Sequence, residues 1–267
     1  MAKLRLVARN VSWWKSGLSV GEKLSYYPSM AISVARDLAT KEKRLNYLGE
    51  SMEYDNTAAP LTMQLYPEEI SNKILENTDG AIKSVLDIGG NIGQFSRTMS
   101  YFLPKADIHV IEPNPDVFEL LTKNTETVGN IAIHNVGIGK PGKTTMHYTP
   151  GKSGTGSLFK DNAGGATTQE IEIELVNDVE KLTKTKSFDL VKIDVEGYEF
   201  QLLKEIKPFK TRYMFIEVSG LSRHKDYSHS EFYRLIEEKF GSFDIVHQTI
   251  TYKTLNNFDV LLKFTDA

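Results

Sequence analysis

The sequence contains three groups of residues whose types and spacing could bind a ligand or carry out chemistry. The first is VLDIGGNIG at residues 85–93, where an expected strand runs into an expected helix. Its glycines allow tight turning and close approach of a ligand, and the helix N-terminus offers free N–H groups to an anion. A dinucleotide-binding turn would read G-x-G-x-x-G, whereas Asn91 and Gln94 stand where its second and third glycines belong. The segment therefore fits NAD poorly and favours a smaller ligand, with Asp87 available to an amine.

The second group centres on Glu112, which ends the next expected strand in the segment HVIEPNP. A carboxylate at this place can accept two hydrogen bonds from a ribose diol. Glu112 follows Gly93 by 19 residues, close to the spacing of roughly 20 residues for a ribose-binding acid. Ligands of open α/β sheets bind at the carboxyl ends of the strands, where both groups fall. The two groups together predict a nucleotide-type site.

The third group is a pair of acids, Asp194 and Glu196, in the segment DLVKIDVEGYE. Alternation along an extended chain puts both carboxylates on one side, although a strand-end acid that caps a helix is the plainer interpretation. With Glu217 near the end of a later strand, they could hold a divalent cation such as Mg²⁺ or orient a hydroxyl. His224 follows in the next loop, where a histidine is more often solvated than catalytic. The candidate catalytic residues are Asp194, Glu196, Glu217 and His224.

Strand-like and helix-like segments that alternate from residue 81 onward must position these groups. Apolar and β-branched runs predict strands at 84–88, 107–111, 131–136, 171–175, 188–193, 213–218, 243–247 and 258–264. Amphipathic spacing predicts helices at 94–103, 115–127, 200–206 and 230–240. This order predicts an α/β sheet with parallel crossovers and helices on both faces, and the 171–175 strand at an edge. The plainer interpretation of the Gly/Ser/Thr-rich segment 149–168 is a surface loop, and its position in the chain favours the alternative, a mobile loop over the site.

Residues 1–80 are predicted to form a mainly helical extension ahead of the α/β domain at 81–267. Apolar spacing between residues 30 and 47 allows an amphipathic helix, and the first 50 residues hold nine basic and four acidic side chains. Trp13 and Trp14 stand beside Lys15. A helical cap packed on the main domain is the favoured interpretation. A lid, or an arm that contacts a membrane surface or a partner, is the alternative.

Composition narrows the class of protein. The chain has 267 residues, 40% of them hydrophobic and 25% charged, with a net charge of −3, which is ordinary for a globular protein. The absence of cysteine excludes disulfides, thiolate nucleophiles and cysteine metal sites. No apolar run is long enough for a membrane span or a secretory signal, so a cytoplasmic location is the default expectation. The acidic balance disfavours nucleic acid as a general partner.

Four segments together resemble a known family. VLDIGGNIGQFS, VIEPNP, NVGIG and LVKIDVEGYEFQLLKEI, in this order, resemble the FkbM family of S-adenosylmethionine (SAM)-dependent O-methyltransferases, over roughly residues 82–220. The resemblance implies a Rossmann-like class I methyltransferase fold with a seven-stranded, mostly parallel sheet. It also implies a glycine turn at the methionine end of SAM, Glu112 on the ribose, and the turn at 135–137 near the adenine. The predicted cofactor-binding residues are Asp87, Gly89, Gly90, Asn91, Gly93, Glu112, Asn135, Gly137 and Asp194.

The activity that the resemblance implies is transfer of a methyl group to a hydroxyl of a sugar, glycan or secondary metabolite. The donor is already activated, so positioning supplies much of the rate, and a general base or a metal assists removal of the proton. A non-catalytic SAM-binding scaffold and, less favoured, an NAD(P)-dependent oxidoreductase are the alternatives. The basic excess in the first 50 residues keeps a 2′-O-methyltransferase acting on RNA in consideration. Residues 1–80 could also form a homo-oligomer interface.

Overall fold

A seven-stranded sheet forms the centre of the protein in this computed structural model. The structure describes residues 43–48, 50–55, 66–158, 168–218, 228–250 and 257–265. The strand order is β11-β12-β10-β9-β3-β4-β5, and neighbours pair parallel except β12, which runs antiparallel to both its neighbours. The strands are β3 (Ser84–Ile88), β4 (Asp107–Ile111), β5 (Ile131–His134), β9 (Ser187–Ile193), β10 (Lys210–Val218), β11 (Phe243–Ile250) and β12 (Phe258–Phe264). The mostly parallel sheet predicted from the sequence is confirmed.

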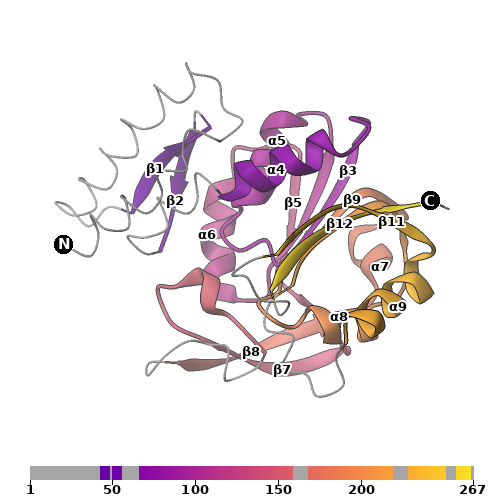
Figure 1. The fold of residues 1–267 in the computed structure, drawn as a ribbon. Coiled ribbons are helices and arrows are strands. Elements are labelled where there is room, and N and C mark those ends of the chain that lie inside the picture. The colour runs from indigo at the N-terminus through magenta and orange to yellow at the C-terminus, as the bar shows by residue number, and fades with distance from the viewer. Residues whose placement is uncertain are drawn as a thin grey trace.

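Helices cover both faces of this sheet (Figure 1). Alternation along β3 sends Val85 into one apolar cluster and Leu86 into the other. The first cluster is completed by α4, α5 and α6, and the second by α7, α8 and α9. Their bounds are α4 (Tyr66–Glu76), α5 (Gln94–Phe102), α6 (Pro115–Thr125), α7 (Val179–Thr183), α8 (Glu199–Glu205) and α9 (His229–Phe240). The two clusters pack the sheet between its helical layers.

A second, three-stranded sheet lies beside the carboxyl ends of β3, β4 and β9 (Figure 1). Its order is β6-β8-β7, and its strands are β6 (Gly137–Ile138), β7 (Gly142–Tyr148) and β8 (Gln169–Val176). The prediction of an edge strand at 171–175 is wrong, because β8 pairs on both sides and is the middle strand of this sheet. A short 3₁₀ turn at Ser153–Thr155 follows β7, and residues 159–167 of the predicted loop lie outside the described residues.

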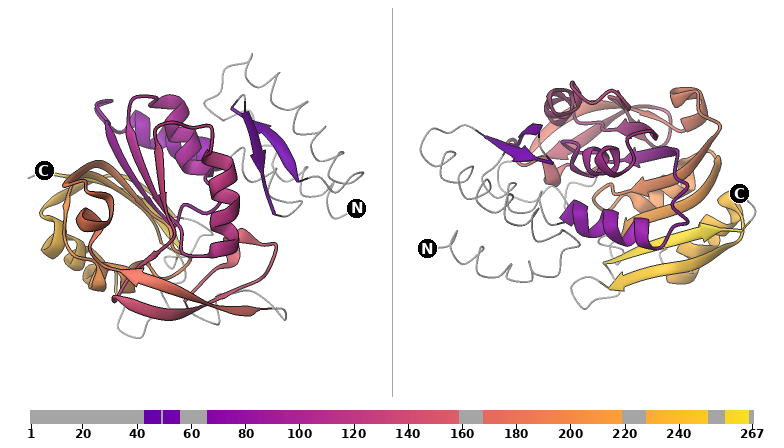
Figure 2. Two further views of the ribbon diagram at one scale, coloured as in Figure 1. Left: turned by 180° about the vertical axis from the view of Figure 1, so that it is seen from behind. Right: turned by 90° about the horizontal axis from the view of Figure 1, so that it is seen from above.

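A β-hairpin, β1 (Arg44–Tyr47) and β2 (Glu50–Glu53), precedes the main sheet. Its buried side chains form a small cluster with the start of α5 and with α6, made by Tyr47, Met52, Tyr54, Ile92 and Val117. Asn124 of α6 bonds the backbone of Glu53 in both directions, at 2.7 and 2.9 Å, and also bonds Ile92 O at 2.8 Å. Both views in Figure 2 place the hairpin far from β11 and β12. The hairpin therefore packs against the glycine turn of the 85–93 segment, through Ile92.

The hairpin stands where the sequence predicted the end of a helix at 30–47. Strand pairing and packing on α6 override the weak helical spacing there, and residues 1–42 lie outside the described residues. Helix α4 packs on α5 and contributes Ile70 and Ile74 to the apolar cluster of the sheet, so the α/β core extends N-terminal of residue 80. The separate extension stays a prediction for the remaining residues. Within the described part of the chain, no helix has the length and apolar character needed to cross a membrane.

Candidate active site

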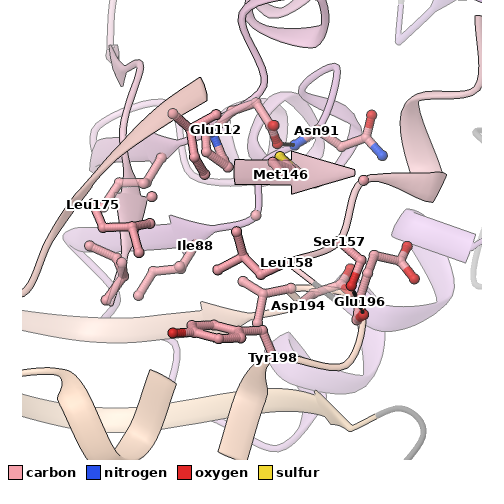
Figure 3. A pocket seen from close by; sticks show the side chains of 18 of the residues that line it. Ile88, Asn91, Glu112, Met146, Ser157, Leu158, Leu175, Asp194, Glu196 and Tyr198 are labelled. Carbon is pink, nitrogen blue, oxygen red and sulfur yellow. Dashed lines mark hydrogen bonds between the residues drawn. The ribbon is translucent and has the colours of Figure 1, made fainter. Parts of the chain in front are cut away.

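A cavity opens where the carboxyl ends of β3, β4 and β9 face the small sheet. It offers about 670 Å³ of space not filled by atoms, a volume that includes the open solvent at its mouth. Figure 3 shows polar side chains at one end, among them Asn91, Asp194 and Glu196, and apolar ones toward the other, among them Leu175. The cavity lies where ligands bind in open α/β sheets.

The glycine turn forms one wall of the cavity. Gly89 has a φ of +82°, and a Cβ there would lie 1.8 Å from Asp194 O, so only glycine fits. Asn91 also has a positive φ, +51°, and its side-chain Oδ1 accepts a hydrogen bond from Ile92 N at 2.8 Å. Asparagine tolerates this left-handed conformation better than most residues. The turn therefore brings bare backbone to the cavity.

Glu112 faces the cavity from the end of β4, as Figure 3 shows. Its two carboxylate oxygens accept one N–H each, from Asn91 at 3.0 Å and from Asn114 at 2.9 Å. Burial raises the pKa of Glu112 to about 7, and these two hydrogen bonds only partly oppose the rise. Each oxygen keeps a further accepting position. This arrangement fits the two hydroxyls of a ribose.

Asp87 lies near the end of β3, as the sequence predicted, but its side chain is not open to the cavity. Its carboxylate is completely buried behind the wall and accepts hydrogen bonds from Ser96 at 2.5 Å and from Lys192 at 3.4 Å. It is absent from the cavity lining, so a direct contact with an amine of the ligand is not what this arrangement offers. Asp194 does line the cavity, and its Oδ2 accepts from the same lysine at 3.1 Å.

The turn after β9 projects Glu196 toward the cavity mouth. Glu196 has a φ of +51°, and the buried Glu199 stabilises the turn by accepting the N–H groups of Val195 at 3.2 Å and Gly197 at 2.9 Å. Part of the Glu196 side chain is exposed to solvent at the cavity, but many protein atoms lie around its carboxyl group. This enclosure, together with the carboxylates of Asp194 and Glu199, raises the pKa of Glu196 to about 8. A carboxyl group with such a pKa is suited to exchange protons near neutral pH.

The opposite end of the cavity is apolar. Gly137 starts β6 there, and a Cβ on it would lie 2.5 Å from a methyl of Leu175. The apolar lining includes Ile111, Ile138, Met146, Leu158, Ile173 and Leu175. The segment 153–158 closes one side, where Ser157 Oγ donates to Glu196 O at 3.3 Å and Ser153 N–H donates to the Asp55 carboxylate. Part of the predicted loop therefore does lie over the site.

Three further residues that were predicted to bind the cofactor lie next to the cavity lining but are not part of it. Gly90 packs on Val110, and Gly93 begins α5 with a φ of +94°. Asn135 Nδ2 donates to the backbone oxygens of Glu112, at 2.9 Å, and Pro113, at 3.3 Å. These residues shape the cavity without lining it.

The predicted metal site is not formed by the described residues. Asp194 and Glu196 line the cavity and Glu217 does not. The parts of the chain that the structure describes bring no three His, Cys, Asp or Glu side chains together in a group that could hold an ion. Asp194, Glu196 and Glu217 therefore do not form a three-carboxylate group in this arrangement, and a Mg²⁺ requirement stays a prediction. His224 lies outside the described residues.

The sequence analysis gave no role to Lys192, Glu199 or Tyr198, although all three lie in the segment DLVKIDVEGYE that carries Asp194 and Glu196. A lysine inside an apolar strand, LVKI, is the signal that could have identified the first of them. Tyr198 lines the cavity and donates to Glu205 Oε2 at 2.8 Å. The apolar lining from β6–β8 gave no signal, because its residues are dispersed along the chain.

The sheet order, the glycine turn and the acid at the end of β4 define a Rossmann-like protein with a nucleotide-type cofactor site. The chain belongs to the methyltransferase FkbM domain family, whose sequence pattern matches residues 87–242, more than half of the chain. The predicted family is thus confirmed.

The individual relatives share less than a third of their aligned residues with this chain. Methyltransferase 1 of Beauveria bassiana is 28% identical in an alignment of 175 residues that covers 57% of this chain and 70% of that protein. The hexuronic acid methyltransferase AglP of Haloferax volcanii is 28% identical over 119 residues, 44% of this chain and less than half, 47%, of AglP. A structure of Aeropyrum pernix fibrillarin with bound S-adenosyl-L-methionine overlaps 84% of this chain and 83% of its own at 12% identity, with a TM-score of 0.43.

Proposed function

We propose that this protein is a SAM-dependent O-methyltransferase whose acceptor is a hydroxyl group of a sugar, glycan or secondary metabolite. The observation that carries the proposal is the position of Glu112, which faces the cavity between the glycine turn and the apolar lining. Each of its carboxylate oxygens accepts one backbone N–H and can accept a further hydrogen bond. Membership of a methyltransferase family supports it. The hexuronic acid methyltransferase among the relatives supports a sugar acceptor in particular.

The residues present fit the parts of SAM. Glu112 would hold the ribose, the apolar lining around Ile138 and Leu175 would hold the adenine, and Gly89, Asn91 and Asp194 would hold the methionine portion. When bound, SAM supplies a methyl group activated by its positively charged sulfur. The carboxylates on the polar side of the cavity are suited to that charge.

Glu196 is the group that we propose as general base. Its carboxyl group lies at the cavity mouth with the pKa raised to about 8, so the ionised form, which can accept the proton of an acceptor hydroxyl, increases as the pH rises through about 8. The hydroxyl oxygen would gain the methyl group as the bond between that methyl and the donor sulfur breaks, and the electron pair of this bond would stay on sulfur, which leaves SAH. The hydroxyl proton would pass to a carboxylate oxygen of Glu196, and solvent would later remove it. Asp194 is paired with Lys192, so it is better suited to bind and orient than to take up a proton.

The cofactor assignment is tested by calorimetric titration with SAM, S-adenosylhomocysteine (SAH) and NAD(P)H. We expect micromolar binding of SAM and SAH and none of NAD(P)H. Glu112→Ala should weaken SAM binding at least about a hundredfold, because it removes both ribose contacts and frees two backbone N–H groups. Glu119→Ala, an exposed glutamate of α6 paired with Lys123, is the matched control and should bind like the wild type. Binding of NAD(P)H without SAM would refute the proposal.

The acceptor is tested by incubating the protein with radiolabelled SAM and a panel of hexuronic acids, neutral sugars and RNA. Label transferred to a sugar hydroxyl, and lost in Glu196→Gln while SAH still binds, would support both the reaction and the base. Label transferred only to RNA would indicate a 2′-O-methyltransferase instead. Tight SAM binding without transfer to any acceptor class would favour a non-catalytic scaffold.

A further inference from the structure

Lys192 is a buried cation directly behind the cavity wall. It lies in β9, only 5% exposed, and its cross-strand neighbour in β3 is Asp87. Its ammonium lies 3.4 Å from Asp87 Oδ1, 3.1 Å from Asp194 Oδ2 and 5.5 Å from the centre of the Phe95 ring. A lysine is seldom buried so completely unless carboxylates pair with it.

The surroundings keep this lysine charged. Burial alone would lower its pKa, but the negative charges of Asp194, Asp87 and Glu217 outweigh burial and hold the pKa of Lys192 above its ordinary value. Two of these carboxylates, those of Asp87 and Asp194, form ion pairs with the ammonium. Only Asp194 among them lines the cavity.

The same lysine joins the two strand ends that flank the cofactor turn. Asp87 is fixed from its other side by Ser96 of α5, at 2.5 Å. Asp194 abuts the glycine turn, since its carbonyl oxygen occupies the place of a Gly89 side chain. Through these two aspartates, Lys192 connects β3, β9 and the start of α5 at the polar end of the cavity.

We propose that Lys192 is a positioning residue that holds Asp194 on the cavity wall and offsets the negative charge there, and so limits how strongly the site prefers SAM over SAH. This inference rests on the proposed function. SAM and SAH differ by one methyl group and by the positive charge on sulfur. A cavity with less positive charge behind it would bind the cationic SAM more tightly relative to the product SAH.

The test is calorimetric binding of SAM and of SAH at pH 8.5, without any acceptor, to the wild type, Lys192→Met and Lys192→Arg. We expect the ratio of the SAH to the SAM dissociation constant to rise about tenfold in Lys192→Met, from the loss of one charge near the sulfur. Lys192→Arg keeps the charge and should return the ratio toward the wild-type value. Lys123→Met, which removes an exposed lysine on α6, controls for net charge and should leave the ratio unchanged.

Removal of one member of a buried charged group can unfold a protein. The double variant Lys192→Met with Asp87→Asn removes one charge of each sign, so it should fold, and its ratio should stay near the wild-type value because the net charge behind the wall is unchanged. An unchanged ratio in folded Lys192→Met, or a ratio that rises about tenfold in the double variant, would overturn the inference and leave the proposed function standing. A wild-type protein that binds neither compound would overturn both.

Discussion

Glu199 offers a direct test of the charge balance beneath the site. Its carboxylate is fully buried, with Oε1 accepting two backbone N–H groups of the turn that carries Glu196. Oε2 is buried and has no hydrogen-bond partner among the described residues. Burial raises the pKa of Glu199 from its ordinary 4.5 to about 7, and the hydrogen bonds from Gly197 and Val195 only partly oppose it. Glu199→Gln keeps an oxygen that can accept the same two bonds and removes the ionisation.

The sign follows from the raised pKa. The folded protein holds the Glu199 proton up to about pH 7, whereas the unfolded chain releases it near pH 4.5. The associated stability is therefore fully present below pH 4.5 and is lost as the pH rises through about 7. The difference between the two pKa values corresponds to about 3 kcal/mol. Most of it falls between pH 5 and pH 8.

The assay is urea unfolding followed by far-UV circular dichroism at several pH values between 5 and 8. The wild type should lose about 2–3 kcal/mol of unfolding free energy across this range that Glu199→Gln retains. Any penalty from the buried amide shifts the whole curve of the variant and leaves its slope unchanged. Glu126→Gln, at an exposed position after α6, is the control and should follow the wild type. Parallel curves for the wild type and Glu199→Gln would refute the reasoning.

Two further perturbations test the geometry of the site. Gly89→Ala should destabilise the protein by on the order of 3 kcal/mol or more, because the added carbon meets Asp194 O. Gly80→Ala, which also has a positive φ but open space around it, should cost only about 1 kcal/mol in the same unfolding assay, and equal losses would contradict the collision. Asn124→Ala removes three hydrogen bonds between α6, the hairpin and Ile92. Amide hydrogen exchange in β1 and β2 should become faster, while β3 and β9 stay protected. Unchanged exchange in the hairpin would show that these three hydrogen bonds do not hold it in place.

The local sequence pattern was sufficient to predict the bounds of the central strands β3 and β4. The bounds predicted for β3 and β4 match the structure, because continuous apolar runs such as SVLDI are typical of strands buried on both faces. The position of Glu112 followed from the same logic, since the ends of adjacent parallel strands share one edge of a sheet. The glycine turn could be predicted as well, because its backbone demands are local.

Pairing between distant segments could not be predicted in this way. β7, with the sequence GKTTMHY, carries little apolar alternation and is a strand because β8 pairs with it. β1 and β2 form a hairpin because Tyr47 and Met52 find a buried place against Ile92 and Val117. Both cases depend on partners that no short window of sequence contains.

The sequence by itself determined the family, the parallel sheet and the presence of acids at the ends of β4 and β9. Only the tertiary structure decided which acids reach the cavity: Asp194 and Glu196 line it, while Asp87 is enclosed behind the wall with Ser96 and Lys192. The physical reason is that a side chain's hydrogen-bond partners and burial, and therefore its charge and pKa, are set by residues distant in the chain. Strand periodicity fixes the face on which a carboxylate lies, and packing fixes its chemistry.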